Sequence, residues 1–469
     1  MSISLSLYHR LPASSRSIVA SMRGFYLGWW RYDKQTERIV EETLERDYWT
    51  ESQWEKWSQD RLSFVLYRSA TKVPYYRDIW AKRRRNGDRA SHEYLENWDV
   101  LEKQTLRERA AEFVADDQDR KKMYRDHTSG TTGTSLDLWM TRETVKYWYA
   151  LSEARWRRWY GVSKKDRWAI LGGQLVTPVA QTQPPFWVWN AGLNQLYMSS
   201  YHLSPNNLKF YLESLKEKRI RYVVGYSSAL YSLAQAVRAE NRKDIRFDVV
   251  ITNAEPLYDY QRALISDAFD CPVKETYGMA EMAAAASECS SGNLHQWPEA
   301  GVIEKNVNKG SSLPHEFICT GLVNSDMPLI RYRIGDSGTL SDELCDCGRT
   351  LPLIGKVEGR NDDLLFTVDG RRIGRLDPVF KDAFEIAEAQ IIQKSLREII
   401  VRYVPANKPL KDGELKIADR IRDRMGDVQV RFEAVSEIER TARGKFRAVV
   451  CELSEVEREK FTSNAAVTG

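Results

Sequence analysis

The sequence has no long apolar run, few cysteines and little excess charge, and each shortage excludes a class of protein. No window of about 18 residues is wholly apolar, so we expect no membrane-spanning helix. Six cysteines in 469 residues are too few for a disulfide scaffold, which favours a cytoplasmic protein. The formal net charge is only +4, from 70 basic and 66 acidic residues, so we expect no nucleic-acid partner.

The beginning of the chain also lacks the features of a secretory signal. Arg10, Arg16 and Arg23 interrupt it, and no continuous apolar core is present. Hydrophobic residues make up 42% of the chain and charged residues 29%, as in an ordinary globular protein. The length allows about two or three domains.

The spacing of apolar residues changes twice along the chain. Residues 1–110 have the spacing of helices. Strands and helices then alternate, which indicates a largely parallel α/β sheet with ligands beyond the carboxyl ends of its strands. A further change introduces the pattern of a small α+β domain. We therefore predict a helical region over 1–110, a large α/β domain over 111–360 and a small domain over 361–469.

Three segments have an unusual composition. The tract Lys82–Arg85 is expected to be a solvated helix end, with contact to an anionic membrane surface or an acidic partner as the alternative. The basic and aromatic run 155–168 fits an amphipathic helix with buried tryptophans, with single-stranded nucleic-acid stacking as the alternative. Residues 169–208 contain no Asp, Glu, Lys or Arg, and we expect them to form part of a buried polar pocket wall.

The most informative stretch is His127-Thr-Ser-Gly-Thr-Thr-Gly-Thr-Ser135. Glycine lets a backbone approach a ligand closely, and hydroxyl and N–H groups can surround an anion such as the polyphosphate of ATP. No lysine follows Gly133, so this is not the common phosphate loop. A flexible linker is the alternative interpretation.

Four short motifs follow this loop in order, at 253–257, 276–282, 331–336 with its continuation 359–363, and 440–448. Each motif alone is a common turn, strand or hairpin, but each also offers a group that suits an ATP site. A tyrosine ring can stack on a purine, a carboxylate can hold Mg²⁺ beside phosphates, and an arginine fork or a lysine can stabilise negative charge. The residues that offer these groups, with an aspartate for the ribose hydroxyls, are Tyr277, Glu281, Asp336, Arg360 and Lys445.

In this order and spacing the motifs resemble the adenylate-forming superfamily of acyl-CoA synthetases, adenylation domains and luciferases. Within it, the chain is most similar to the phenylacetate–CoA ligase family, in the CapK-like branch found with capsule polysaccharide genes. The resemblance covers roughly residues 110 to 455. The stretches that carry it are 127–135, 184–208, 225–234, 276–282, 327–336, 359–363, 368–381, 388–393 and 444–450.

The resemblance implies an ATP-dependent acid ligase, with a large α/β domain that binds ATP and the acid and a small, mobile α+β lid domain. The carboxylate of the acid would attack the α-phosphate of ATP, giving acyl-AMP and pyrophosphate. The lid would then rotate and the thiol of CoA would take the acyl group. One alternative is transfer to a sugar amine or hydroxyl in capsule biosynthesis, and another is an inactive scaffold in a polysaccharide assembly complex. The protein would be a monomer or a homodimer.

The resemblance also implies roles for individual residues. Lys445 and Glu281 would be catalytic, with Glu281 holding Mg²⁺, and Asp362 would be the hinge of the lid. The residues implied to bind the nucleotide are Thr128, Ser129, Gly130, Thr131, Thr132, Gly133, Thr134, Glu255, Tyr277, Gly278, Asp336 and Arg360.

Within that set, the loop would hold the phosphates, Glu255 and Tyr277 would flank the adenine, and Asp336 with Arg360 would hold the ribose. Two positions depart from the pattern of the superfamily. Thr134 stands where many members have Lys, and Ala280 stands where many have Thr. The first departure removes a mobile cation from the loop.

A separate group of residues has the composition of a metal site. Cys289 and His295 lie close together, and Cys345 and Cys347 are separated by one residue. The last two can hardly form a disulfide with each other, but they can share an ion. Together the four offer Cys₃His, which suits a structural Zn²⁺ site. Unpaired thiols and a surface histidine are the alternative.

Overall fold

The structure, a computed structural model, divides into two compact units. One contains residues 1–334 and 338–356, and the other contains 335–337 and 357–469. The structure describes residues 5–127, 136–178, 180–203, 205–304, 315–341, 343–360, 365–368, 372–373, 377–380, 385–405, 413–440, 446–454 and 457. The larger unit is α/β and the smaller is α+β, as expected from the sequence.

The larger unit begins with a series of helices whose starts follow local capping rules. The Asp33 side chain accepts a hydrogen bond from the Thr36 N–H, Thr50 and Gln53 form a capping box, and Pro74 occupies the first turn of its helix. The helices are α1 (Leu5–His9), α2 (Ala13–Arg31), α3 (Lys34–Arg46), α4 (Glu51–Lys72), α5 (Pro74–Arg85) and α6 (Lys103–Arg109). None of the described helices is long and apolar enough to cross a membrane.

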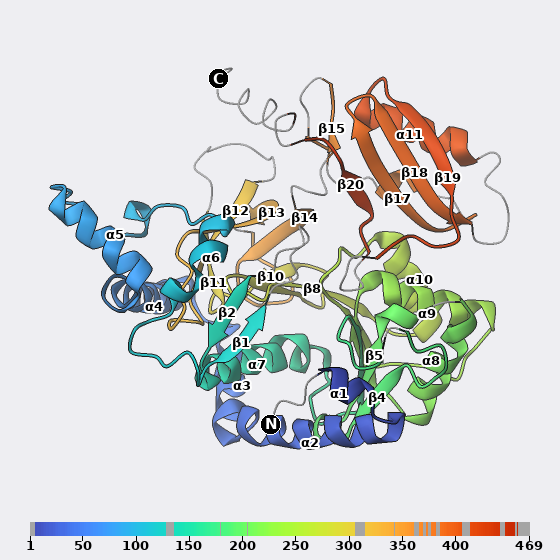
Figure 1. The fold of residues 1–469 in the computed structure, drawn as a ribbon, viewed down its shortest axis with the longest axis horizontal. Helices are drawn as coiled ribbons and strands as arrows, with labels where there is room; N and C mark the ends of the chain where they lie inside the picture. The colour runs from blue at the N-terminus through green and yellow to red at the C-terminus, as the bar shows by residue number, and fades with distance from the viewer. Residues whose placement is uncertain are drawn as a thin grey trace. The chain divides into compact units, whose positions relative to one another are not determined.

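A sheet of twelve strands forms the centre of this unit, and its parallel part is built from short, buried apolar runs. Strands with both faces covered need such runs. The parallel strands, in spatial order, are β5 (Gln195–Ser199), β3 (Trp168–Gly172), β6 (Tyr222–Gly225), β7 (Val249–Thr252) and β8 (Val273–Gly278). The helices α8 (Pro205–Glu217), α9 (Ser227–Ala239) and α10 (Asp259–Phe269) lie together beside these strands (Figure 1).

The rest of the sheet extends from both sides of this parallel core. On one side β4 (Trp187–Asn190) pairs antiparallel with β5 and forms an edge. Two serines of α2 reach that edge: the Trp189 N–H donates to Ser17 Oγ at 3.2 Å, and Ser21 Oγ donates to the Trp189 carbonyl at 3.3 Å. On the other side follow β9 (Ala285–Glu288), β10 (Leu294–Gln296), β14 (Leu353–Arg360), β13 (Tyr332–Ser341), β12 (His315–Gly321) and β11 (Gly301–Glu304).

The hairpin of β1 (Tyr124–His127) and β2 (Asp137–Met140) brackets residues 128–135, which lie outside the described residues. The helix α7 (Arg142–Trp156) follows it. This helix ends at Trp156, and Gly161 has a positive φ of 73°. The run 155–168 is therefore not the single amphipathic helix that the sequence predicts, and its Arg155 and Arg157 are buried with polar partners. The tract Lys82–Arg85 does form the last turn of α5, with Lys82, Arg84 and Arg85 exposed, as expected.

The described residues of the smaller unit form a sheet with one α-helix packed on it. Its strands, in spatial order, are β19 (Gln429–Ala434), β18 (Glu398–Pro405), β17 (Ile386–Ser395) and β20 (Val449–Cys451), and its helix is α11 (Gly413–Met425). Ile399 and Val401 of β18 pack with Ile417 and Ile421 of α11 in its core. A short ladder of β15 (Leu365–Phe366) and β16 (Arg372–Ile373) completes the unit.

Candidate functional site

Three neighbouring parallel strands, β6, β7 and β8, end at the same edge of the sheet, and several candidate residues follow those ends. Ligands bind at such edges in α/β proteins. Glu255 follows β7, Tyr277 and Gly278 close β8, and Glu281 lies in the turn after it. The fold therefore places four of the candidate residues on adjoining strand ends.

Glu255 closes the turn after β7 by binding the start of α9. Its carboxylate accepts from the Ser228 N–H at 3.0 Å and from Ser228 Oγ at 2.7 Å, and its carbonyl accepts from Ser227 Oγ at 3.2 Å. A carboxylate at a helix N-terminus satisfies N–H groups that lack a partner within the helix. The side chain expected beside the adenine thus also fixes the turn that would face it.

Tyr277 lies near the end of β8 with its ring partly exposed. Its neighbour Thr276 is buried and donates to the Thr252 carbonyl at 2.7 Å, so alternation along the strand directs Tyr277 to the other face. The Tyr277 ring meets Phe317 of β12 edge to face, with 6.5 Å between the centroids. Gly278 is exposed.

Glu281 is an almost buried carboxylate, with a side chain 8% exposed. Its Oε1 lies 3.6 Å from Nζ of Lys103, the first residue of α6, and accepts from the Tyr332 hydroxyl at 3.2 Å. A buried carboxylate needs such partners to offset its loss of hydration. Sequence reasoning missed both: Tyr332 lies inside the motif 331–336 without an assigned role, and a lysine at a helix start gives no sequence signal.

The remaining nucleotide candidates belong to the smaller unit or lie outside the described residues. Asp336 lies in β13 after Gly335, whose φ is 84°, and groups with the smaller unit. Arg360 is the last residue of β14, and its side chain is outside the described residues, as are residues 128–135, Asp362 and Lys445.

The four candidate metal ligands do come together. One ligand atom from each of Cys289, His295, Cys345 and Cys347 lies within 4.8 Å of the others. Cys289 follows β9, His295 lies in β10, and the other two precede β14. Cys289 Sγ and Cys345 Sγ are 3.6 Å apart, and Cys347 Sγ is 3.3 Å from His295 Nε2.

These distances fit a shared tetrahedral ion. Zinc–sulfur and zinc–nitrogen bonds of ~2.3 and ~2.0 Å would place two sulfurs ~3.8 Å apart and a sulfur and a nitrogen ~3.5 Å apart. With three thiols and one imidazole the ion would have no open position, as in structural zinc sites. The donor set therefore fits Zn²⁺.

The surroundings of His295 favour ligation, while the pKa values of two of the thiols shift in opposite directions. Nδ1 of His295 lies 3.0 Å from the Leu351 carbonyl, to which it donates, so Nε2 faces Cys347. Burial lowers the pKa of His295, which keeps the imidazole neutral. Burial raises the pKa of Cys289 to about 11. Burial acts the same way on Cys345, but a hydrogen bond from Asn293 and others outweigh it and lower its pKa.

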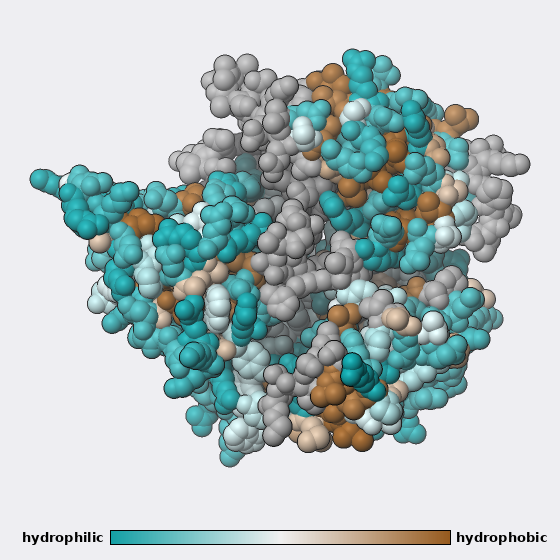
Figure 2. Space-filling model, in the orientation of Figure 1, coloured by the Kyte–Doolittle hydropathy of each residue, from teal (hydrophilic) through white to brown (hydrophobic). Residues whose placement is uncertain are grey.

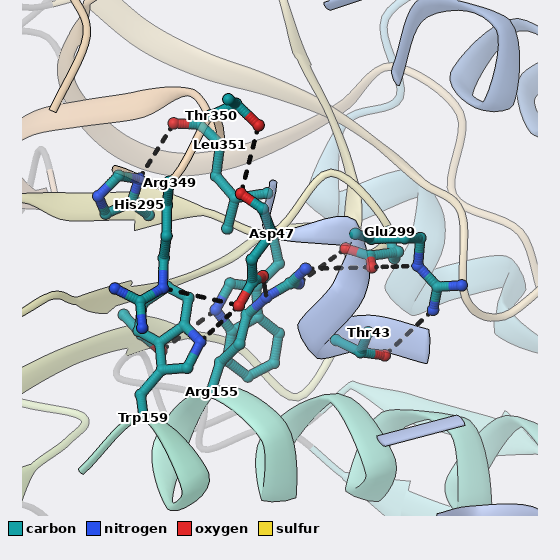
Figure 3. A network of polar contacts seen from close by, with 12 residues as sticks. Thr43, Asp47, Arg155, Trp159, His295, Glu299, Arg349, Thr350 and Leu351 are labelled. Carbon is teal, nitrogen blue, oxygen red and sulfur yellow. Dashed lines mark hydrogen bonds and ion pairs between the residues drawn. The ribbon is translucent and has the colours of Figure 1, made fainter. Parts of the chain in front are cut away.

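A buried polar network joins the ligand segment to the helices (Figure 3). The Thr350 N–H donates to the Asp47 carbonyl at 2.9 Å, and the Asp47 carboxylate accepts from Trp159 Nε1 at 2.7 Å. Arg155 of α7 binds Asp47 at 2.9 Å and Glu299 at 2.7 Å, and all three side chains are at most 1% exposed. This network fixes the end of α3 and the helix α7 to the segment that carries two of the thiols.

Comparison with known proteins gives matches along almost the whole chain. Residues 365–452 match a family model described as the CapK C-terminal domain. Protein CapK of Staphylococcus aureus is 26% identical over 452 residues, which are 95% of this chain and 98% of that protein. A phenylacetate-coenzyme A ligase of Thermus thermophilus is 29% identical over 149 residues, which are 29% of this chain and 34% of that protein.

A solved structure of 2-hydroxyisobutyryl-CoA ligase, in the postadenylation state and in complex with R3-HIB-AMP, has a TM-score of 0.68 to this chain. The two are 18% identical, and the match covers 90% of this chain and 94% of the ligase. The chain therefore has the fold of that ligase, and the resemblance to adenylate-forming ligases and CapK is confirmed.

Proposed function

Because the chain is a homologue of CapK with the fold of an acyl-CoA ligase, we propose that it activates a carboxylic acid with ATP and passes the acyl group to a thiol such as CoA. The acid carboxylate attacks the α-phosphate, the bond to pyrophosphate breaks, and acyl-AMP forms. The acceptor then displaces AMP. In this proposal residues 111–360 bind ATP and the acid, and residues 361–469 form the lid.

The observation that carries this proposal is Glu281, a carboxylate 8% exposed in the turn that follows a central parallel strand. Tyr277 precedes Glu281 in the sequence, near the end of β8, and it is the residue proposed to stack on the purine. Magnesium at Glu281 would neutralise charge on the phosphates of ATP. The Glu281 carboxylate would hold that ion, and the Tyr332 hydroxyl would orient the carboxylate by its hydrogen bond.

The remaining roles follow the motifs. Residues 128–135 would bind the phosphates, Glu255 and Tyr277 with Gly278 would flank the adenine, and Asp336 with Arg360 would bind the ribose. Lys445 would stabilise the charge that grows on the attacked phosphate and the attacking carboxylate.

The test is ATP–pyrophosphate exchange with a panel of aromatic, aliphatic, hydroxy and amino acids. We expect one class to support exchange, and Glu281→Gln to reduce that exchange by roughly a hundredfold because the magnesium ligand loses its charge. Glu55→Gln on the exposed face of α4 is the control and should exchange like the wild type. Exchange by no acid of the panel would favour the scaffold alternative.

The acyl acceptor needs a second measurement. Homology to CapK over 95% of the chain favours a sugar amine or hydroxyl as the alternative to CoA. AMP release from the activated acid, measured with CoA and with amino sugars in parallel, separates the two. AMP release that depends on CoA supports a thiol as the acyl acceptor. AMP release that depends on the amino sugar shows that the acceptor is the sugar instead.

We also propose that Cys289, His295, Cys345 and Cys347 hold one structural Zn²⁺. Elemental analysis of protein purified without chelator should give about one equivalent, and Cys345→Ser should lose the metal and melt at a lower temperature because metal binding stabilises the folded state. Cys271→Ser, at a buried thiol outside the cluster, should keep its zinc. Zinc-free wild-type protein would leave these residues as ordinary thiols and a histidine.

A further inference from the structure

The outer face of α2 carries a continuous apolar stripe. Ile18, Met22, Phe25 and Trp29 are 61%, 68%, 61% and 74% exposed. Their spacing of four, three and four residues places them on one side of the helix. In Figure 2 a hydrophobic patch lies at the lower edge of the view, where Figure 1 draws α1 and α2. An exposed apolar surface of this kind marks an interaction site.

The opposite face of α2 holds the helix firmly, so the stripe cannot turn inward. Leu27 and Trp30 are buried on that side. A Cβ at Gly192 would lie 2.1 Å from the backbone nitrogen of Phe25, so glycine is what allows α2 to approach the turn after β4. The hydrogen bonds of Ser17 and Ser21 to β4 fix the rotation of the helix. The stripe is therefore a preformed surface.

The helix α2 itself carries charge of one sign, and the acidic residues beside it, Asp33 and the exposed Glu143, lie near Trp29 at its C-terminal end. Residues 5–32 contain no Asp or Glu, and Arg10 and Arg23 are exposed. Arg142 lies next to the stripe and donates to the Tyr26 hydroxyl at 2.6 Å. Acidic residues begin at Asp33, which pairs with Lys146 Nζ at 2.7 Å. The partner that suits this surface is apolar with negative groups at its boundary.

We propose that α2 docks the protein on an anionic lipid surface, lying in the plane of the interface. Its apolar side chains enter the boundary between headgroups and acyl chains, and Arg10 and Arg23 meet lipid phosphates. With 19 residues and three arginines, α2 lies on a bilayer and does not span it. This surface is independent of the proposed acid-ligase site.

A second copy of the chain suits the stripe less well. In a two-fold dimer the same patch faces itself. The exposed Arg23 would then be brought toward the other α2, which carries no acidic residue to pair with it. Lipid phosphates supply that missing charge.

The experiment is flotation of the full chain with two kinds of vesicle, one of phosphatidylcholine alone and one of phosphatidylcholine with phosphatidylglycerol. We expect binding to the anionic vesicles that weakens with added salt. Phe25→Ser/Trp29→Ser should weaken it by at least about tenfold, since burial of one large apolar side chain alone corresponds to roughly that factor. Arg10→Gln/Arg23→Gln should weaken binding to the anionic vesicles several-fold.

The control is Tyr67→Ser/Leu415→Ser, at side chains 63% and 70% exposed on other helices, which should bind like the wild type. Phe25, Trp29 and Arg23 on α2 and Arg10 before it are all exposed, so the melting temperature reports whether each variant is folded. The proposal is overturned if the wild type binds neither vesicle, if both kinds bind equally, or if Phe25→Ser/Trp29→Ser binds unchanged. A dimer that dissociates in this variant, without vesicle binding, would assign the stripe to a second copy.

Discussion

Replacing Arg155 with methionine should destabilise the larger unit strongly, because this guanidinium holds two buried carboxylates. Arg155 is fully buried, and its nitrogens lie 2.9 Å from Asp47 Oδ1 and 2.7 Å from Glu299 Oε2 (Figure 3). Methionine keeps most of the length of the side chain and removes the charge. In the variant, Glu299 keeps its ion pair with Arg46, at 3.0 Å. Asp47 keeps the hydrogen bond from the Trp159 ring N–H and a longer ion pair with Arg349, at 3.6 Å.

We expect a loss of about 3–5 kcal/mol in the free energy of unfolding at neutral pH, the cost of breaking a buried ion pair by removing one partner. The assay is urea unfolding of wild type and variant, followed by tryptophan fluorescence. Arg125→Met is the matched control, because its ion pair with Asp137 is exposed and such pairs contribute little.

The pH dependence gives a sharper test. Burial acts to raise the pKa of Glu299, but Arg155 and Arg46 outweigh it and hold that pKa below its usual value. The wild type therefore keeps this stabilisation above the unfolded pKa and loses it as pH falls through the folded pKa. Without Arg155 burial dominates and the pKa rises, so the variant loses stability as pH rises. The difference between the two proteins should shrink on acidification, and a difference below about 1 kcal/mol, or one that does not change with pH, would refute the reasoning.

Three further predictions concern the proposed site. Lys445→Ala should reduce ATP–pyrophosphate exchange by roughly a hundredfold and leave ATP binding nearly unchanged, since the lysine acts on charge that develops in the transition state; exchange at the wild-type rate would remove it from catalysis. Asp336→Ala should weaken ATP binding measured by calorimetry, because each ribose hydroxyl loses a charge-assisted bond of about 1.5–3 kcal/mol; an unchanged dissociation constant would exclude the role. Lys103→Met should lower the magnesium concentration for half-maximal exchange several-fold, because the ammonium 3.6 Å from Glu281 competes for the same carboxylate; an unchanged or higher concentration would contradict the competition.

The sequence was most informative where the signal is local. The stretches 221–226 and 248–255, which the sequence predicts as strands, contain β6 and β7, because parallel strands covered on both faces need short runs of apolar residues. The predicted strand over 428–435 and the predicted helix over 414–426 likewise match β19 and α11. The Cys₃His set was found from residue types alone, and the structure brings its ligand atoms within 4.8 Å, although metal binding stays a proposal.

Long-range partners were not predictable. Arg155 belongs to a run predicted to be an amphipathic helix with buried tryptophans, or else a nucleic-acid-binding surface. Its burial depends on Asp47 and Glu299, which are 108 and 144 residues away in the chain. The presence of an arginine in the sequence does not indicate which distant carboxylate will pair with it in the fold. Lys103 was missed for the same reason, because its meeting with Glu281 depends on how α6 packs against the turn after β8.

The hydrogen bonds between α2 and β4 have a consequence for solubility. β4 is the last strand of the sheet, and the outer backbone groups of such a strand are a template for pairing with another chain. Ser17 accepts from the N–H of Trp189 and Ser21 donates to its carbonyl, so two side chains of a helix occupy hydrogen-bonding positions that a foreign strand would use. The helix α2 thereby protects β4 from pairing edge to edge with another chain. A chain shortened to begin after residue 31 would lack α2 and would expose the outer edge of β4.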